Sequence, residues 1–455
     1  MNTEYYLMPK EFVKSGNVWK FMLTRSDEKK YADRYYTKPP KSTVRVIDKS
    51  EKGTEENPFD NVNEASDYIR KLEEDAFAND ALLRDIASQQ YFYDLEFRQF
   101  RVPWACSYVS FYHDDNIPAD GFIVNQNQIH PDGKFHFTLK PNLYGKKFLY
   151  RGQSQDYPKP CTPNLYRDET KTYFLDDLIW SQEMEVLMTT HPLVKLLEKG
   201  VVIMHDHFSI LMNLVGLAQH YYHKTHFLDL TSDLESAKFF ATTNYNSKTD
   251  EYKPVHDTEK LGMIYCYELQ MPGAFALQEG YALSVIGKQV FMRSGAQHGF
   301  LLGMDKGVDF KTIPQVRKFY FRHDPTISDE IFKQSDNGKK YFPMDILEEA
   351  WKDKYKQRLE NGVVSADAVR LNVSRNPEET FESICQKLKN RNIIVDDIHP
   401  SFAPELLDQY YKSIKEGWWE EFCSDIYFHG GDAALYKDCL MRISKRDEYR
   451  WAFER

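Results

Sequence analysis

The 455-residue sequence lacks several patterns that would place it in a class at once. Its six cysteines form no C-x-x-C pair and have no regular spacing, which indicates free thiols in a reducing compartment instead of disulfides or a zinc site. Nowhere do about 18 apolar residues run together, so we expect no membrane-spanning segment. The first residues show no basic region followed by an apolar run, so we expect no signal peptide. These absences predict a cytoplasmic protein with no membrane partner.

Acidic residues also outnumber basic residues in the sequence. The net charge of −10 at pH 7 argues against a broad nucleic-acid surface. The glycine-rich phosphate loops G-x-G-x-x-G and G-x-x-x-x-G-K-[ST] do not occur. Three histidines follow one another at three-residue steps (His220, His223 and His226), yet no cysteine or carboxylate completes a tetrahedral set with them. We therefore predict no metal site.

The chain does have ample material for a folded core. Hydrophobic residues make up 42% of it, and tyrosine and phenylalanine number 30 each. A chain of 455 residues is long for one core, so two or three domains are expected. We predict an α+β protein with three parts: an N-terminal α/β accessory region (1–140), a central domain (141–325) and a mostly helical C-terminal region (326–455).

Local patterns predict the elements of these regions. Short runs rich in aromatic and β-branched residues indicate strands at 146–152, 225–231, 262–269 and 288–293. Helical spacing of apolar residues indicates helices between residues 63 and 100 and at 176–200, 344–362 and 377–392. Ser232 and Glu235 have the spacing of a capping box, which predicts a helix that begins directly after Ser232.

Arg151 and Gly152 end the first predicted strand of the central domain, where a charged residue directly after an apolar run needs a physical explanation. A guanidinium there can clamp a diphosphate through two hydrogen bonds, and a glycine lets a ligand or another backbone approach closely. Alternatively, Arg151 neutralises a buried carboxylate, for which Asp229 in the apolar run "FLDLT" is the natural partner. Strand alternation places Asp229 and Thr231 on the same face. The residues alone leave both interpretations open.

Three ordered sequence blocks lead to a resemblance. An aromatic-Arg-Gly-Gln run at 150–153 is followed by a Pro-Asn-Leu-Tyr-Arg stretch that ends at Arg167. The second block carries Gln219, His220, Tyr221, Thr225, Leu228, Asp229 and Thr231, and the third carries Arg293, Gln297 and Gly299. Taken in this order, the blocks resemble the FRG family. The chain departs from the family pattern at Tyr222, His226 and Leu230, where the family has glycine, arginine and tryptophan.

The layout of that family is similar to ADP-ribosyltransferases of the Arg-Ser-Glu type. The resemblance implies a central split mixed sheet, NAD as a substrate and no metal. It also implies a toxin-like or antiphage role and a macromolecular acceptor of unknown type. Gln297 stands where those enzymes have their catalytic glutamate, and it carries no charge.

The resemblance also assigns roles to individual residues. Arg151 would clamp the diphosphate, His220 and Thr231 would position ribose and nicotinamide, and Gln297 would touch the reactive ribose. Gln153, Gln219 and Asp229 complete the set expected to bind the nucleotide. Two functions follow: an ADP-ribosyltransferase or NAD glycohydrolase, or, because the glutamate is missing, a non-catalytic nucleotide-sensing or protein-binding module.

Overall fold

The structure is a computed structural model. It describes residues 51–79, 118–126, 135–143, 146–168, 174–199, 201–203, 206–210, 212–221, 223–246, 251–269, 281–313 and 315–427.

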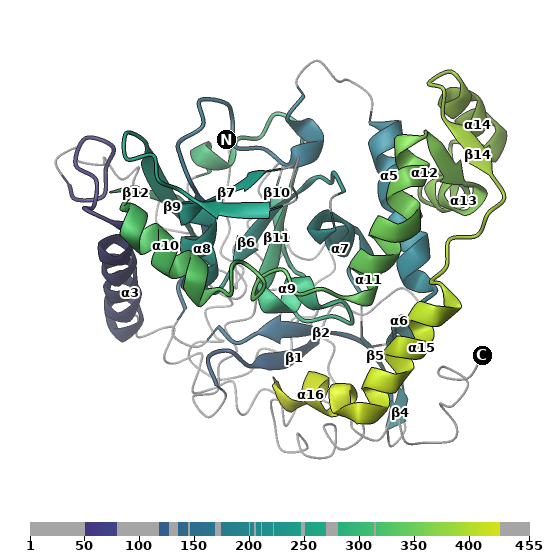
Figure 1. Cartoon of the computed structure of the whole chain (residues 1–455), viewed down its shortest axis with the longest axis horizontal. Coiled ribbons are helices and arrows are strands. Elements are labelled where there is room, and N and C mark those ends of the chain that lie inside the picture. Colours follow the sequence, from purple (N-terminus) through teal and green to yellow (C-terminus); the bar gives the residue numbers. More distant parts are fainter. Residues whose placement is uncertain are drawn as a thin grey trace, which may run out of the picture.

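A six-stranded sheet forms the centre of the predicted central domain (Figure 1). Its strands, in spatial order, are β10 (Tyr281–Val285), β11 (Gly299–Met304), β6 (Phe227–Thr231), β3 (Phe148–Gln153), β9 (Leu261–Glu268) and β12 (Val316–Arg322). The strands predicted from the first three apolar runs are confirmed as β3, β6 and β9. The prediction of a mixed sheet is wrong here, because every pairing in this sheet is antiparallel.

A second sheet lies below the first in Figure 1 and is mixed. Its order is β15 (Ile426–Tyr427), β1 (Phe122–Gln126), β2 (Phe135–Pro141), β5 (Asp206–Ile210) and β4 (Val201–Ile203). Its β15–β1 and β2–β5 pairings are parallel. Two small sheets pair β7 (Thr243–Asn246) with β8 (Glu251–Pro254) and β13 (Val363–Ser365) with β14 (Ile394–Asp396). The second sheet thus joins strands from the beginning, middle and end of the described chain.

Helices cover the sheets and dominate the described C-terminal residues (Figure 1). The first group is α3 (Val62–Asn79), α5 (Leu175–Thr189), α6 (Pro192–Lys199), α7 (Leu214–His220), α8 (Leu234–Thr242) and α9 (Met292–Ala296). The second is α10 (Pro325–Gln334), α11 (Ile346–Ala350), α12 (Lys356–Glu360), α13 (Ala366–Arg375), α14 (Phe381–Lys389), α15 (Pro404–Ser413) and α16 (Trp419–Ser424). The α+β class and the mostly helical C-terminal part are confirmed.

Two local predictions are wrong, each because a neighbouring side chain decides the start of a helix. Residues 288–293 were predicted as a strand, but α9 begins at Met292, whose backbone N–H donates to a carboxylate oxygen of Asp345 at 3.0 Å. The helix after β6 is capped by Asp233 instead of Ser232, since the Asp233 carboxylate accepts from the N–H groups of Glu235 and Ser236. The carboxylate one residue later provides the stronger cap.

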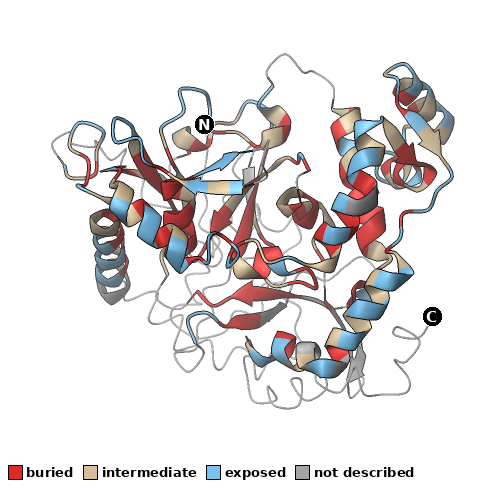
Figure 2. Ribbon diagram, in the orientation of Figure 1, coloured by how far each residue is buried: buried red, intermediate tan, exposed pale blue. Residues whose placement is uncertain are grey.

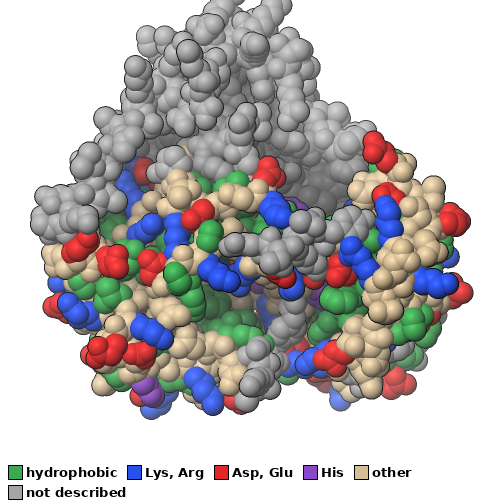
Figure 3. Space-filling model, turned by 90° about the horizontal axis from the view of Figure 1, so that it is seen from above, with side chains coloured by type: hydrophobic (Ala, Val, Ile, Leu, Met, Phe, Trp, Pro, Cys, Tyr) green, Lys and Arg blue, Asp and Glu red, His purple; other side chains and the backbone are tan. Residues whose placement is uncertain are grey.

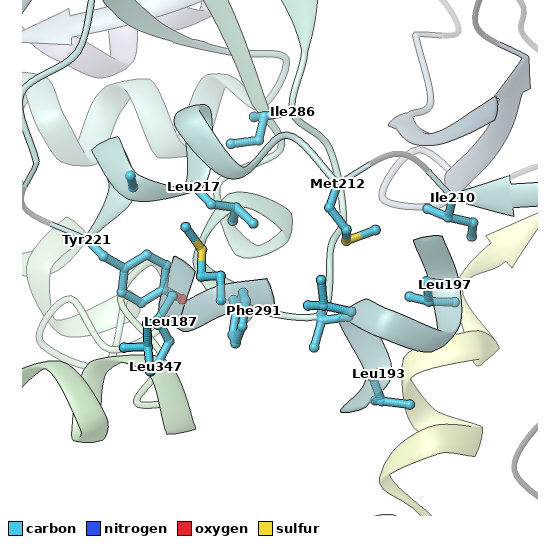
Figure 4. Packing of buried hydrophobic residues seen from close by; sticks show 14 of the residues in the cluster. Leu187, Leu193, Leu197, Ile210, Met212, Leu217, Tyr221, Ile286, Phe291 and Leu347 are labelled. Atoms are coloured by element: carbon cyan, nitrogen blue, oxygen red, sulfur yellow. The ribbon is translucent and has the colours of Figure 1, made fainter. Parts of the chain in front are cut away.

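The main hydrophobic cluster connects distant parts of the chain (Figure 4). Leu187 of α5, Leu217 of α7, Phe291 and Leu347 of α11 lie in this cluster, and each is fully buried. Ile426 of β15 belongs to it as well. Figure 2 shows the same division, with buried residues along the strands of the six-stranded sheet and exposed residues on the outer faces of the helices. Burial of this apolar surface is the main force that holds the helical C-terminal part against the sheets.

The accessory helix α3 is bonded directly to the strand that carries Arg151. The buried carboxylate of Glu73 accepts from the backbone N–H groups of Lys147 at 2.9 Å and Phe148 at 3.0 Å, and from the hydroxyl of Tyr150. Burial, followed by the charge of Glu73, raises the pKa of Tyr150 well above its ordinary value. The N-terminal region therefore fixes the position of β3.

The described residues contain no helix with the length and apolar character needed to cross a membrane. Within the same residues, no three His, Cys, Asp or Glu side chains are grouped so that they could hold a metal ion. Four of the six predicted free thiols (Cys161, Cys266, Cys385 and Cys423) are free in the structure. Cys106 and Cys439 lie outside the described residues.

Two buried histidines give a testable pH dependence. His191 packs against Phe402 and Tyr410, and His223 packs against Trp351; burial lowers the pKa of each imidazole to about 3. Since both pKa values lie below the unfolded value of about 6.5, the unfolded state gains protons first as the pH falls. Their contribution to stability is therefore fully present above pH 6.5 and is lost on acidification. Between pH 7 and pH 5 each should cost about 2 kcal/mol.

Urea unfolding at these two pH values measures this cost. Nδ1 of His191 accepts a hydrogen bond from the backbone N–H of Leu193 at 3.2 Å. The variant His191→Asn keeps an acceptor for this N–H but has no side chain that titrates. Its loss of stability between pH 7 and pH 5 should be about 2 kcal/mol smaller than that of the wild type. His256→Asn is the control, because the side chain of His256 is 59% exposed. An equal pH dependence in the wild type and His191→Asn would contradict the assignment.

Candidate functional site

The candidate site begins where β3 and β6 separate. The ladder between these two strands consists of the single pair Tyr150 and Thr231. One residue further along, Nη1 of Arg151 donates to the backbone carbonyl oxygen of Asp229 at 2.9 Å. The Nε of Arg151 is buried and has no partner within the described part of the chain. The guanidinium thus bridges the diverging strands and keeps donor capacity for a ligand.

The side chains of Arg151 and Asp229 leave the six-stranded sheet on opposite faces. Arg151 pairs with Tyr265 across the β3–β9 ladder, and Tyr265 lies in the cluster with Leu228 and Leu230. Asp229 alternates with these leucines, so its side chain points to the other face. The predicted face assignment in β6 is therefore confirmed. The interpretation that Arg151 neutralises the Asp229 carboxylate is not supported, since the bond is made to the Asp229 backbone.

The carboxylate of Asp229 is held in place and remains accessible. Its side chain is 43% exposed. Oδ1 accepts from Nε2 of Gln219 at 2.6 Å and lies 3.6 Å from Nε2 of His220. The other end of the Gln219 amide accepts a hydrogen bond from the hydroxyl of Thr225. Gln219 and Thr225, both matched to the family pattern, therefore set the orientation of Asp229.

His220 lies behind this carboxylate, with a side chain that is 4% exposed. Burial lowers the pKa of His220; the nearby charge of Asp229 and a hydrogen bond with the Gln297 side chain oppose this, while the charge of Arg293 adds to it. The ring is consequently neutral at pH 7. It can support Asp229 from inside the protein, but a ligand cannot reach it freely.

Thr231 and Gln297 are bonded to each other and to the protein. The Thr231 hydroxyl donates to the backbone carbonyl of Gln297 at 2.6 Å and accepts from the N–H of Asp233 at 2.9 Å. The Gln297 side chain is buried, and its Nε2 donates to the carbonyl of Tyr341 at 2.9 Å. Both residues lie beside His220 and Asp229, yet their polar groups already serve to hold β6, α9 and the segment before α11 together.

A second arginine lies close to Arg151. Arg167 is exposed, and burial of part of its side chain followed by the positive charge of Arg151 lowers its pKa, while Cys161, Asp229 and Tyr157 act in the opposite direction. Arg167 therefore lies within electrostatic range of both Arg151 and the Asp229 carboxylate. Gln153 donates to the sulfur of Cys161 at 3.7 Å, and its Oε1 has no partner among the described residues.

Gly152 allows another part of the backbone to approach the end of β3 closely. A Cβ at this position would lie 1.9 Å from the carbonyl oxygen of Ala237 and 2.6 Å from the nitrogen of Ala241. Both belong to α8, so the backbone of this helix, and no ligand, occupies the space beside Gly152. Of the two expectations for this glycine, the close approach of another backbone is the one observed.

Arg293, the first residue of the third block, is a buried structural cation. Its Nη1 donates to the carbonyl of His220 at 2.9 Å, and its Nη2 donates to the carboxylate of Glu348. The guanidinium lies over the ring of Tyr221, 4.6 Å from its centroid. The hydroxyl of Tyr221 in turn donates to Asp345. These bonds tie α7 and α9 to α11, and nothing in the sequence blocks indicates the acidic partners.

Other glutamates do not supply a carboxylate at this site. Glu235 pairs with Arg70 and Lys238, and Glu268 pairs with Lys147 and Arg317. Glu279 lies outside the described residues. Asp229 is therefore the carboxylate that the described structure places near Arg151, His220 and Gln297.

Comparison with known proteins agrees with this organisation. Residues 146–250 match the family model of the FRG domain, a range that includes β3, β6, α8 and the loop ending at Arg167. The third block, from Arg293 to Gly299, lies beyond the matched range. No curated protein and no solved structure matches the chain. The protein thus contains an FRG domain, and the packing described above supports that domain from both flanking regions.

Proposed function

We propose that the FRG domain binds NAD or a related nucleotide and cleaves the bond between the ribose and nicotinamide. Arg151 and Arg167 would hold the diphosphate, and Asp229 would face the reacting ribose. The observation that supports this best is the half-exposed Asp229 carboxylate, which is oriented by Gln219 and lies within electrostatic range of Arg167, beside the point where β3 and β6 separate. Figure 3 shows that Lys and Arg side chains are interspersed with Asp and Glu side chains over this face of the described surface.

The chemistry explains why a fixed carboxylate matters. As the glycosidic bond breaks, the bonding electrons leave with nicotinamide and the ribose gains oxocarbenium character. A carboxylate placed beforehand stabilises this positive charge more in the transition state than in the ground state. Water or a nucleophilic group of a macromolecule then bonds to the ribose carbon and releases a proton. The first course is NAD hydrolysis and the second is ADP-ribosyl transfer; a toxin-like or antiphage role is compatible with either.

In this proposal the buried residues act as positioning residues. His220, neutral and 3.6 Å from Oδ1 of Asp229, limits the directions in which the carboxylate can turn. Gln297 lies beside His220 and is held by Tyr341, while Thr231 fixes the Gln297 backbone. Gln297 thus occupies the sequence position of a catalytic glutamate but carries no negative charge.

The second candidate is a nucleotide-sensing or protein-binding module without catalysis. The commitment of the Gln297 amide to Tyr341 and the two internal bonds of the Thr231 hydroxyl favour it. Such a module would use the same arginines but would leave NAD intact. Both candidate functions therefore include NAD binding, and they differ in whether the bound NAD is cleaved.

A single assay separates these functions. The protein is incubated with NAD, released nicotinamide is measured by chromatography, and binding is measured by calorimetry. We expect the wild type to release nicotinamide and Asp229→Asn to bind NAD but react about a hundred-fold more slowly. Asp257→Asn is the matched control, because the Asp257 carboxylate has a similar exposure of 47% and lies in a surface ion pair with Lys260.

Each other outcome has a clear meaning. Binding of NAD without release of nicotinamide by the wild type would replace the enzyme with the sensing module. Equal rates for the wild type and Asp229→Asn would remove Asp229 from the mechanism. No binding by the wild type would overturn the proposal as a whole. Radiolabelled NAD in the same reaction shows whether a macromolecule becomes modified.

A further inference from the structure

Tyr157 is an exposed aromatic residue in a rigidly held loop. Its side chain belongs to the exposed large hydrophobic residues, with 42% of its surface accessible. It follows the end of β3 by four positions, since β3 ends at Gln153. A single exposed tyrosine is common on protein surfaces and needs no explanation by itself. The number of bonds that fix this one is the unusual feature.

The loop is anchored at its beginning by polar contacts from two other elements. The hydroxyl of Ser154 donates to the side-chain oxygen of Asn244 in β7 at 2.6 Å. The carbonyl of Ser154 lies 2.7 Å from Nε2 of His323, directly after β12. Ser154 and His323 are buried, so these bonds are shielded from water.

The loop is anchored again at Tyr157 itself. Lys311 donates to the carboxylate of Asp156 at 2.7 Å and also to the backbone carbonyl of Tyr157. The hydroxyl of Tyr320 donates to the other oxygen of Asp156 at 3.1 Å. The backbone on both sides of the ring is therefore held by residues from a different part of the domain. With its backbone fixed in this way, Tyr157 has only its side-chain torsions left to order when a ligand packs on the ring, which keeps the entropy cost low.

The position of the ring relates it to the proposed nucleotide site. The phenol oxygen lies 3.5 Å from the hydroxyl of Ser154. It is also close enough to Arg167 to raise the pKa of that guanidinium, as Asp229 does. Asp156, next to Tyr157, binds Tyr320, and Tyr320 lies in the same hydrophobic cluster as Tyr265, the cross-strand partner of Arg151. Tyr157 therefore lies on the side of the six-stranded sheet from which the Arg151 side chain leaves, with Arg167 close by.

From this geometry we infer that Tyr157 is the platform on which the nucleobase of the bound nucleotide stacks. The inference rests on the proposed function and extends it to the base. A flat purine ring packs on a tyrosine face without needing specific hydrogen bonds. The diphosphate would then extend from the base toward Arg167 and Arg151, and the distal ribose would reach Asp229 through the gap where β3 and β6 separate. The ligand class is an adenine dinucleotide or its ADP-ribose part.

Calorimetric titration of the full chain with ADP-ribose and with inorganic pyrophosphate tests this assignment. Loss of stacking is expected to weaken ADP-ribose binding by Tyr157→Ala about 5- to 150-fold. Pyrophosphate, which has no base, should bind the wild type and Tyr157→Ala equally. Tyr157→Phe keeps the ring and should bind ADP-ribose like the wild type. Tyr245→Ala, in which a tyrosine of 44% exposure is removed from β7, should have no effect.

The outcomes distinguish this inference from the proposed function. Wild-type protein that binds neither probe contradicts the nucleotide site itself. Equal affinity of the wild type and Tyr157→Ala for ADP-ribose overturns the stacking role of Tyr157 but not the nucleotide site. Equal weakening of both probes by Tyr157→Ala also overturns it, because the change would then act through the loop and the arginines.

Discussion

Replacing Arg293 with methionine is expected to lower the free energy of unfolding by about 3–5 kcal/mol. The guanidinium is 2% exposed and its partner Glu348 is 4% exposed, so the variant leaves a buried carboxylate without its main counter-ion. Lys352, which lies 2.7 Å from the other Glu348 oxygen and is 40% exposed, compensates in part. The loss should therefore fall toward the lower end of this range. Denaturant unfolding measures it directly.

A double variant shows whether the pair or the surrounding packing causes the loss. Arg293→Met combined with Glu348→Leu removes both charges, and it should recover much of the stability that the single change loses. Arg370→Met is the control, because Arg370 forms an exposed pair with Asp367 and its side chain is 61% exposed. Its effect should stay below about 1 kcal/mol. A single variant that is no less stable than this control would contradict the buried ion pair.

Gly152→Ala should destabilise the protein by about 3 kcal/mol, because one methyl group cannot fit between β3 and α8. The added carbon would lie 1.9 Å from a backbone oxygen of Ala237, and backbone cannot rotate away as a side chain can. Strand and helix must then separate. Because Arg151 precedes this glycine, the same change should also weaken nucleotide binding.

Gly295→Ala is the matched control for this steric effect. A Cβ at Gly295 would have its nearest neighbour at 3.4 Å, in an ordinary contact with Lys288. Gly295 lies within α9, where alanine is the better helix former. The control should be as stable as the wild type or slightly more stable. Thermal unfolding of both variants decides the matter, and a Gly152→Ala variant with wild-type stability would show that α8 lies further from β3.

Local patterns were sufficient to predict the strands at the centre of the domain. The runs around Leu149, Leu228 and Ile264 are short, apolar and bounded by polar or glycine residues, and they became β3, β6 and β9. Residues 288–293 have the same apolar character but became the start of α9. The difference comes from Asp345, which binds the N–H of Met292 from a position 53 residues away. No local pattern contains such a partner.

The proximity of the candidate residues could be predicted from the sequence, but their geometry could not. Three ordered blocks indicated that Arg151, Asp229 and Gln297 belong together, and contacts link them in the structure. Which groups remain available to a ligand depends on bonds to residues outside the blocks. Tyr341 holds the Gln297 amide, and Glu73 holds the strand before Arg151. Tyr157 had no signal in the sequence, because its rigidity arises from Lys311 and Tyr320.

Sequence patterns alone were enough to predict the α+β class, the main strands, the FRG domain and the absence of a glutamate at position 297. These follow from the period of apolar residues and from residue identities, both of which are local properties of the chain. The three-dimensional structure was needed to establish that the six-stranded sheet is antiparallel, that a helix backbone packs against Gly152, and that Arg151 bonds to the carbonyl of Asp229 instead of its carboxylate. Pairing direction and side-chain partners are set by burial and hydrogen bonding between segments far apart along the chain, and those energies exist only once the segments meet.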